Sequence, residues 1–67
     1  MIQISVNGFT RHYERRLAIA ELLEDMALAG KRIAVERNGE IVPRGAHGAT
    51  LLADGDRLEI VVAVGGG

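Results

Sequence analysis

The residues best suited to chemistry in this 67-residue chain are its last three, Gly65, Gly66 and Gly67. They directly follow an apolar segment and end in an α-carboxyl group, which has an ordinary pKa of about 3.5 and is ionised at neutral pH. Such a carboxylate can attack the α-phosphate of ATP. Glycine lacks Cβ, so its backbone can enter a channel too narrow for other residues. The pattern favours a carrier or modifier protein, with a frayed, functionless terminus as the alternative.

Two histidines and an acidic turn are weaker candidates for chemistry. His12 and His47 have no partner residues at the spacing of a metal site, which needs three or four converging ligands. The segment Asp54-Gly55-Asp56 lacks the twelve-residue pattern of a calcium loop. We therefore expect a solvated turn there, and no metal or cofactor bound by this chain.

A local basic cluster could contact phosphate or an acidic partner. Its members are Arg11, His12, Arg15 and Arg16. The whole chain has eight Lys and Arg against nine Asp and Glu, and its aromatic residues are one Phe and one Tyr. This balance argues against a nucleic-acid-binding function, which normally requires a basic surface and often aromatic stacking residues. A solvated surface before the helix is the more ordinary interpretation of the cluster.

The length and composition indicate one small domain. The chain contains no cysteine, which excludes disulfides, thiolate metal ligands and cysteine nucleophiles, and 48% of its residues are hydrophobic. Its N-terminus has no signal-peptide pattern. The longest apolar run, residues 60–64, is far below the roughly 18 residues that suggest a membrane span. We expect a cytoplasmic protein that contacts no membrane.

The hydrophobic periodicity predicts two hairpins, one helix and a final strand. The Asn-Gly pairs at 7–8 and 38–39 are the strongest two-residue hairpin signals, because both residues tolerate positive φ. Gly30 is placed to be the left-handed C-terminal cap of the helix. The expected elements are strands over 2–6 and 9–13, a helix over 17–28, strands over 33–36 and 40–42, and a strand over 57–62.

This order predicts an α+β fold of the β-grasp, or ubiquitin-like, type: a mixed sheet of four to five strands with one helix packed on one face. The last strand should lie centrally beside the first. The β-grasp domain would span residues 1–64, and residues 65–67 would form a flexible reactive tail. The residues expected in the core are Ile4, Val6, Ile19, Leu22, Leu23, Met26, Ile33, Val35, Leu58, Ile60 and Val62.

The side chains of the last strand that alternate with its core residues predict a partner surface. Val61 and Ala63 should face away from the helix, and Val64 continues this apolar segment toward the glycines. An exposed apolar patch beside a reactive tail is a plausible docking site.

Several segments resemble the ThiS family of sulfur carrier proteins of thiamine biosynthesis, and the resemblance covers the whole chain. They include the V-E-R-N-G, I-V-P-R and G-D-R-L-E-I-V motifs, which are more specific than the terminal glycines shared by all ubiquitin-like carriers. The resembling ranges are 2–8, 20–23, 34–39, 41–44, 55–61 and 63–67.

The resemblance implies a protein that is not an enzyme but a recycled co-substrate. An adenylating enzyme of the E1 type, ThiF, would activate the Gly67 carboxylate with Mg-ATP. Sulfur from a donor such as a cysteine desulfurase would replace AMP and leave a thiocarboxylate on Gly67. Thiazole synthase, ThiG, would then take the sulfur for the thiazole ring.

Other functions remain compatible with these residues. The chain could be a sulfur carrier of the molybdopterin-synthase type or of another pathway. It could also be a noncovalent β-grasp interaction domain, or a small RNA-binding module that uses Arg11, Arg15 and Arg16.

Overall fold

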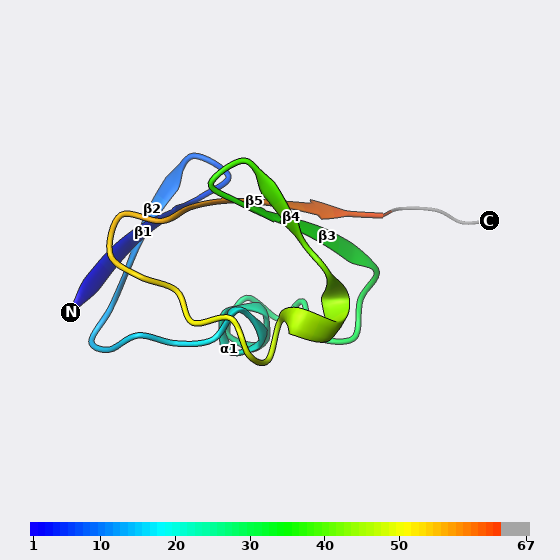
Figure 1. Cartoon of the computed structure of the whole chain (residues 1–67), viewed down its shortest axis with the longest axis horizontal. Coiled ribbons are helices and arrows are strands. Elements are labelled where there is room, and N and C mark those ends of the chain that lie inside the picture. The colour runs from blue at the N-terminus through cyan, green and yellow to red at the C-terminus, as the bar shows by residue number, and fades with distance from the viewer. Residues whose placement is uncertain (64–67) are drawn as a thin grey trace.

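A mixed five-stranded sheet with one helix packed on one face forms the fold, as the sequence predicts. The computed structural model describes residues 1–63. The elements are β1 (Ile2–Val6), β2 (Phe9–Tyr13), α1 (Ile19–Asp25), β3 (Ile33–Arg37), β4 (Glu40–Val42), the 3₁₀ turn η1 (Arg44–Ala46) and β5 (Arg57–Val62). The strand order is β2-β1-β5-β3-β4, so the last strand is central (Figure 1). This is the expected β-grasp, ubiquitin-like arrangement.

Strand β5 has one parallel and one antiparallel neighbour. It pairs with β1 in parallel over Ser5↔Arg57 and Val6↔Leu58. Its antiparallel pairing with β3 is longer, from Arg37↔Leu58 to Ile33↔Val62. Because β1 turns away after two paired residues, the second half of β5 depends on β3 for its ladder.

Both predicted Asn-Gly hairpin turns are present. Asn7 and Gly8 have φ values of 51° and 86°, and Asn38 and Gly39 have 52° and 87°. Positive φ at both central residues is the requirement of the type I′ turn, which matches the twist of the strands that it joins.

The helix is shorter than the predicted 17–28. Gly30 has the predicted left-handed conformation, with φ of 83°, but it lies beyond the helix and its predicted role as the C-terminal cap is wrong. Helix α1 ends at Asp25, and Ala27, with φ of 60°, adopts the left-handed conformation just beyond it. The N–H of Leu28 bonds to the carbonyl of Leu23 at 2.7 Å, and Leu28 packs against the core. Packing of the partly buried Leu28 therefore offsets the strain at Ala27.

The core lies between the sheet and α1, and most of its predicted members are buried. Met26 and Ile33 are partly buried, and Val62 is 40% exposed, so its predicted burial is wrong. Val62 alternates with the exposed Val61 as predicted, but it is the last residue of β5, where the core ends. Core residues that the sequence analysis missed are Ile2, Leu17, Ala18 and Leu52.

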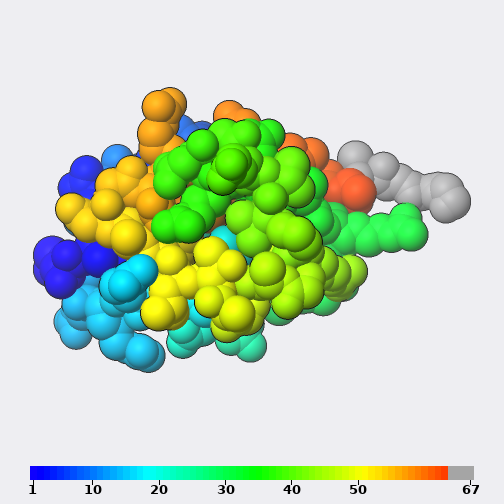
Figure 2. Space-filling model, viewed as in Figure 1, coloured from blue at the N-terminus to red at the C-terminus, as the bar shows by residue number. Residues whose placement is uncertain are grey.

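The segment after η1 closes one side of the core. Leu52 is fully buried, its N–H bonds to the carbonyl of Leu17 at 2.8 Å, and Leu51 pairs with Ala18 in an isolated bridge. Figure 2 shows this segment, in yellow, filling the surface between the N-terminal elements and the 3₁₀ turn. None of the helices in the described residues is long and apolar enough to cross a membrane.

Candidate functional site

The end of β5 is fixed to the start of β3. Val62 pairs with Ile33, and the N–H of Ala63 donates to the carbonyl of Arg32 at 2.9 Å. The sheet therefore holds the chain at the last residue that the structure describes. Gly65, Gly66 and Gly67, predicted as the reactive tail, and Val64 lie outside the described residues.

An exposed apolar patch lies on the sheet face opposite α1. Val61 is 63% exposed and pairs with the exposed Ala34, and Ala63 is exposed beside them. On β4, Ile41 is 64% exposed and pairs with Glu36, so it shares this outer face. The structure thus places Val61 and Ala63 on the predicted face, and docking of a partner there stays a prediction.

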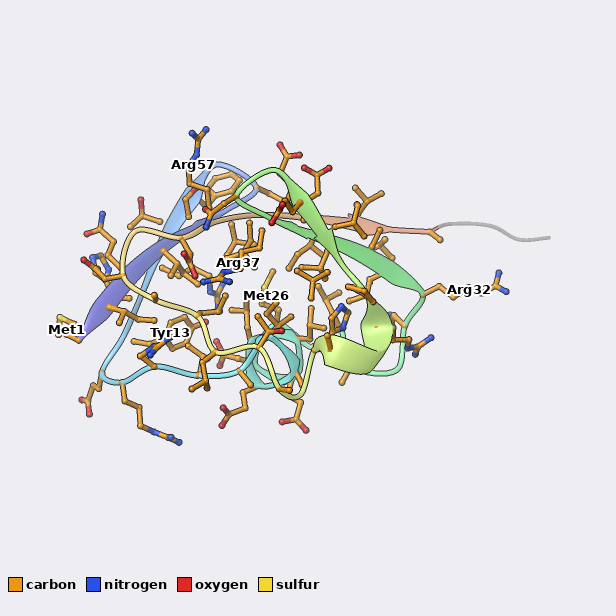
Figure 3. All side chains as sticks on the ribbon, in the orientation of Figure 1. Met1, Tyr13, Met26, Arg32, Arg37 and Arg57 are labelled. Carbon is orange, nitrogen blue, oxygen red and sulfur yellow. The ribbon has the colours of Figure 1, made fainter. Side chains whose placement is uncertain are left out.

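Two arginines flank this patch, and the sequence analysis did not assign them to it. Arg32 and Arg44 line a shallow groove together with Ile33, Ala34, Val61 and Ala63. Both are exposed, and the three ion pairs found within residues 1–63 involve neither of them. In Figure 3, Arg32 extends outward just before β3. In the sequence, each arginine directly flanks a predicted hairpin strand or its terminal proline, but this placement does not show that the two arginines lie close together.

Asp56 corrects the prediction of a fully solvated turn at 54–56. Its side chain is 8% exposed and accepts hydrogen bonds from Arg37 Nε at 2.9 Å, Asn38 Nδ2 at 3.1 Å and the Ala53 N–H at 2.8 Å. Burial raises the pKa of this carboxyl, but the hydrogen bonds from Ala53, Arg37 and Asn38 outweigh it and hold the pKa below its ordinary value. Figure 3 shows Arg37 pointing inward from β3.

The two histidines lie apart, and each makes its own polar contact within the fold. His47 is buried, and its Nε2 is 3.1 Å from the carbonyl oxygen of Val42. His12 Nε2 is 3.0 Å from Gln3 Oε1 on the outer face of β1. Within the described part of the chain, no three side chains of the metal-binding types converge.

The basic cluster is dispersed among separate partners. Arg11 donates to Asp25 at 2.8 Å, and Tyr13 also donates to Asp25 at 2.8 Å. Arg16 Nε donates to the carbonyl of Leu52 at 2.8 Å, and Arg15 lies 3.9 Å from Glu21. These contacts tie β2 and the segment after it to α1 and the 50–56 segment.

A family model and a solved structure agree on one family. The ThiS family model matches residues 4–67. A solved structure of a thiamine biosynthesis protein (ThiS) from Geobacter metallireducens is 35% identical to this chain, with a TM-score of 0.82. The matched region covers 98% of this chain and 100% of the chain in that structure. The chain is also 33% identical over 66 residues to an uncharacterized protein, ycf40, from Pyropia yezoensis, covering 98% of this chain and 93% of that protein.

A further relative is larger than this chain. A thiazole synthase from Paramagnetospirillum magneticum is 36% identical over 66 residues, which is 98% of this chain. The chain spans about a fifth of the length of that protein, since the match covers 20% of it.

Proposed function

This chain belongs to the ThiS family, and we propose from that membership that it carries sulfur for the thiazole ring of thiamine. The observation that carries the proposal is the match to the family model over residues 4–67, which extends through all three C-terminal glycines. The solved ThiS structure, similar over its whole length, supports the same assignment.

The proposed chemistry takes place on the Gly67 carboxylate in the site of a partner. A carboxylate oxygen attacks the α-phosphorus of Mg-ATP in an E1-like adenylating enzyme, ThiF, and pyrophosphate leaves. A donor such as a cysteine desulfurase carries the sulfur as a persulfide, and a thiol reductant releases it as hydrosulfide while the thiol is oxidised to a disulfide. The hydrosulfide then attacks the acyl carbon and AMP leaves. A thiocarboxylate remains on Gly67. The chain itself supplies no catalytic side chain in this scheme and binds no cofactor.

Thiazole synthase, ThiG, is the proposed acceptor of the sulfur. The thiazole synthase from Paramagnetospirillum magneticum contains a stretch similar to nearly all of this chain within a much longer polypeptide. A carrier-like segment joined covalently to a thiazole synthase supports a functional association of the two as separate chains.

The groove at the end of β5 is the proposed docking surface. Val61 and Ala63 supply exposed apolar area, and Arg32 and Arg44 supply positive charge without an ion-pair partner among the described residues. Interfaces combine an apolar centre with a polar rim of complementary charge. We therefore expect the adenylating enzyme to present an apolar surface bordered by carboxylates. Val64 would continue the contact into the partner.

Intact mass spectrometry tests the proposed function. The chain would be incubated with a purified ThiF-type enzyme, Mg-ATP and sulfide. We expect a mass gain equal to the replacement of one oxygen by one sulfur, and no gain when ATP is omitted. An unchanged mass, with an enzyme preparation that converts its own carrier, would contradict the proposal.

A further inference from the structure

The carboxamide of Asn7 continues the β1–β5 ladder after the backbone of β1 has turned away. Asn7 Oδ1 accepts the N–H of Ile60 at 2.7 Å, and Asn7 Nδ2 donates to the carbonyl oxygen of Ile60 at 3.0 Å. The Asn7 N–H also donates to the carbonyl of Leu58 at 2.9 Å. One residue therefore bonds β5 at two successive points on the side facing β1.

The register explains why this contact occurs on that side of β5. Asn38 donates its N–H to the Arg57 carbonyl, and Ala63, just beyond β5, donates its N–H to the Arg32 carbonyl. The backbone N–H and carbonyl groups of odd-numbered residues therefore form their hydrogen bonds with β3 and its flanking residues. The N–H and carbonyl of Ile60 consequently point toward β1. Backbone pairing with β1 ends at Leu58. Among the described residues, the Asn7 side chain provides the last bond to β5 on this side.

The position of this contact bears on the geometry at the end of β5. Ala63 lies only three residues beyond Ile60, or about 10 Å along an extended strand. One edge of β5 is held by β3 up to Ala63, and the other edge is held only up to Ile60. Loss of the Asn7 contact would let the last residues of β5 tilt about their β3 ladder.

We propose that Asn7 is a positioning residue for the sulfur-transfer reaction: its carboxamide, bonded to both backbone groups of Ile60, sets the direction in which β5 leaves the sheet. The inference rests on the proposed function, because it concerns presentation of the C-terminal segment to a partner enzyme. Transfer reactions are sensitive to such geometry, since a displacement of about 1 Å can reduce the rate about 100-fold.

Asn38 provides a matched control at the other end of β5. It occupies the same position of an Asn-Gly turn with nearly the same φ. Its carboxamide also makes two bonds, accepting the Arg57 N–H at 2.9 Å and donating to Asp56 Oδ1 at 3.1 Å. Asn7→Gly and Asn38→Gly each remove two side-chain hydrogen bonds and retain a residue that tolerates positive φ. Only Asn7→Gly acts near the end of β5.

The experiment compares the two variants in adenylation-dependent thiocarboxylation and in amide hydrogen exchange, at a temperature where melting curves show both folded. For Asn7→Gly we expect kcat to fall about tenfold with KM within about twofold, and exchange to accelerate at Ile60. For Asn38→Gly we expect kcat and Ile60 exchange within about twofold of the unmodified chain. Asn7→Asp, which keeps the acceptor for the Ile60 N–H and loses the donor, should give an intermediate kcat.

Three different results would overturn the inference. Equal kcat for Asn7→Gly and the unmodified chain, or an equal loss in Asn7→Gly and Asn38→Gly, would show that the contact is structural only and would leave the carrier function standing. Failure of the unmodified chain to be converted would overturn the proposed function and this inference together.

Discussion

Arg37 Nε and Asp56 Oδ2 lie 2.9 Å apart and join β3 to the turn that precedes β5. The same carboxylate accepts the N–H of Ala53 and the amide of Asn38, so the end of β3 and the 53–56 turn are joined at one buried acid. This cluster fixes the start of the central strand, opposite to the end that leads toward the C-terminal glycines.

The Asp56 cluster should contribute measurably to stability. We expect Asp56→Ala to lower the free energy of unfolding by roughly 1–3 kcal/mol, because it leaves Arg37 and the Ala53 N–H without their acceptor. Urea midpoints would measure this loss. Glu59→Gln, a change on the exposed face of β5, is the control and should stay within about 0.5 kcal/mol. Equal midpoints for the two variants would contradict the structural role of Asp56.

The same acid predicts a pH dependence of stability. Hydrogen bonding lowers the pKa of Asp56 in the folded state below its value in the unfolded chain. Its stabilisation is thus fully present above the unfolded pKa of about 3.9, and is lost as the pH falls through the folded pKa. Unfolding free energies measured across acidic pH should fall less steeply for Asp56→Asn than for the unmodified chain. Parallel curves of unfolding free energy against pH would show that Asp56 does not contribute to the pH dependence of stability.

Leu52 should be as important to the core as the residues of the helix. Leu52→Ala is expected to cost about 2–5 kcal/mol, because the side chain is fully buried and its removal leaves a cavity. The neighbouring Leu51, 48% exposed, is the control, and Leu51→Ala should cost clearly less. Thermal and urea unfolding would measure both variants. A small effect at Leu52 would mean that the 50–56 segment does not close the core.

Val61→Asp and Arg32→Glu should each weaken binding to the adenylating enzyme while the fold remains intact. The first places a charge in the apolar patch, and the second reverses a charge at its rim. Titration calorimetry would measure the affinity, with circular dichroism to confirm folding. Thr10→Asp, on the outer face of the edge strand β2, is the control and should bind normally. Normal binding by the Val61 and Arg32 variants would place the docking surface elsewhere.

The sequence predicted those parts of the fold that depend on local signals. Alternating apolar residues and the turns at Asn7-Gly8 and Asn38-Gly39 defined the strands and hairpins correctly. The burial of Leu52 and Asp56 was not predictable, because it depends on contacts with Leu17 and Arg37 that are distant in the chain. The end of α1 was missed because the packing of Leu28 stabilises a left-handed alanine, which is unfavourable by local propensity.

The candidate site was predictable only in part. The period-two pattern placed Val61 on the outer face, but it gave no indication that Arg32 and Arg44, twelve residues apart, line one groove. Their proximity comes from the β3–β4 hairpin and the 3₁₀ turn that follows it. The Asn7–Ile60 contact was equally hidden, since the turn signal of Asn7 explains its backbone and says nothing about its side chain.

Gly66→Val should block transfer without affecting the fold. A β-branched side chain next to the reacting residue would clash in a channel that accepts glycine backbone. Intact mass after incubation with the adenylating enzyme, Mg-ATP and sulfide would show the loss of conversion, and thermal melts would show unchanged stability. Full conversion would indicate that the partner imposes no steric limit at this position.

Deletion of Gly67 tests the carrier function most directly. The shortened chain still ends in Gly-Gly, but its carboxylate is displaced by roughly 3.5 Å relative to the docked domain. We predict that the unmodified chain gains the mass of one oxygen-to-sulfur replacement in the same assay. The shortened chain should lose most of this conversion, about 100-fold or more in rate, at unchanged melting temperature. Equal conversion of both chains, or conversion of neither, would contradict the assignment of Gly67 as the residue that carries sulfur.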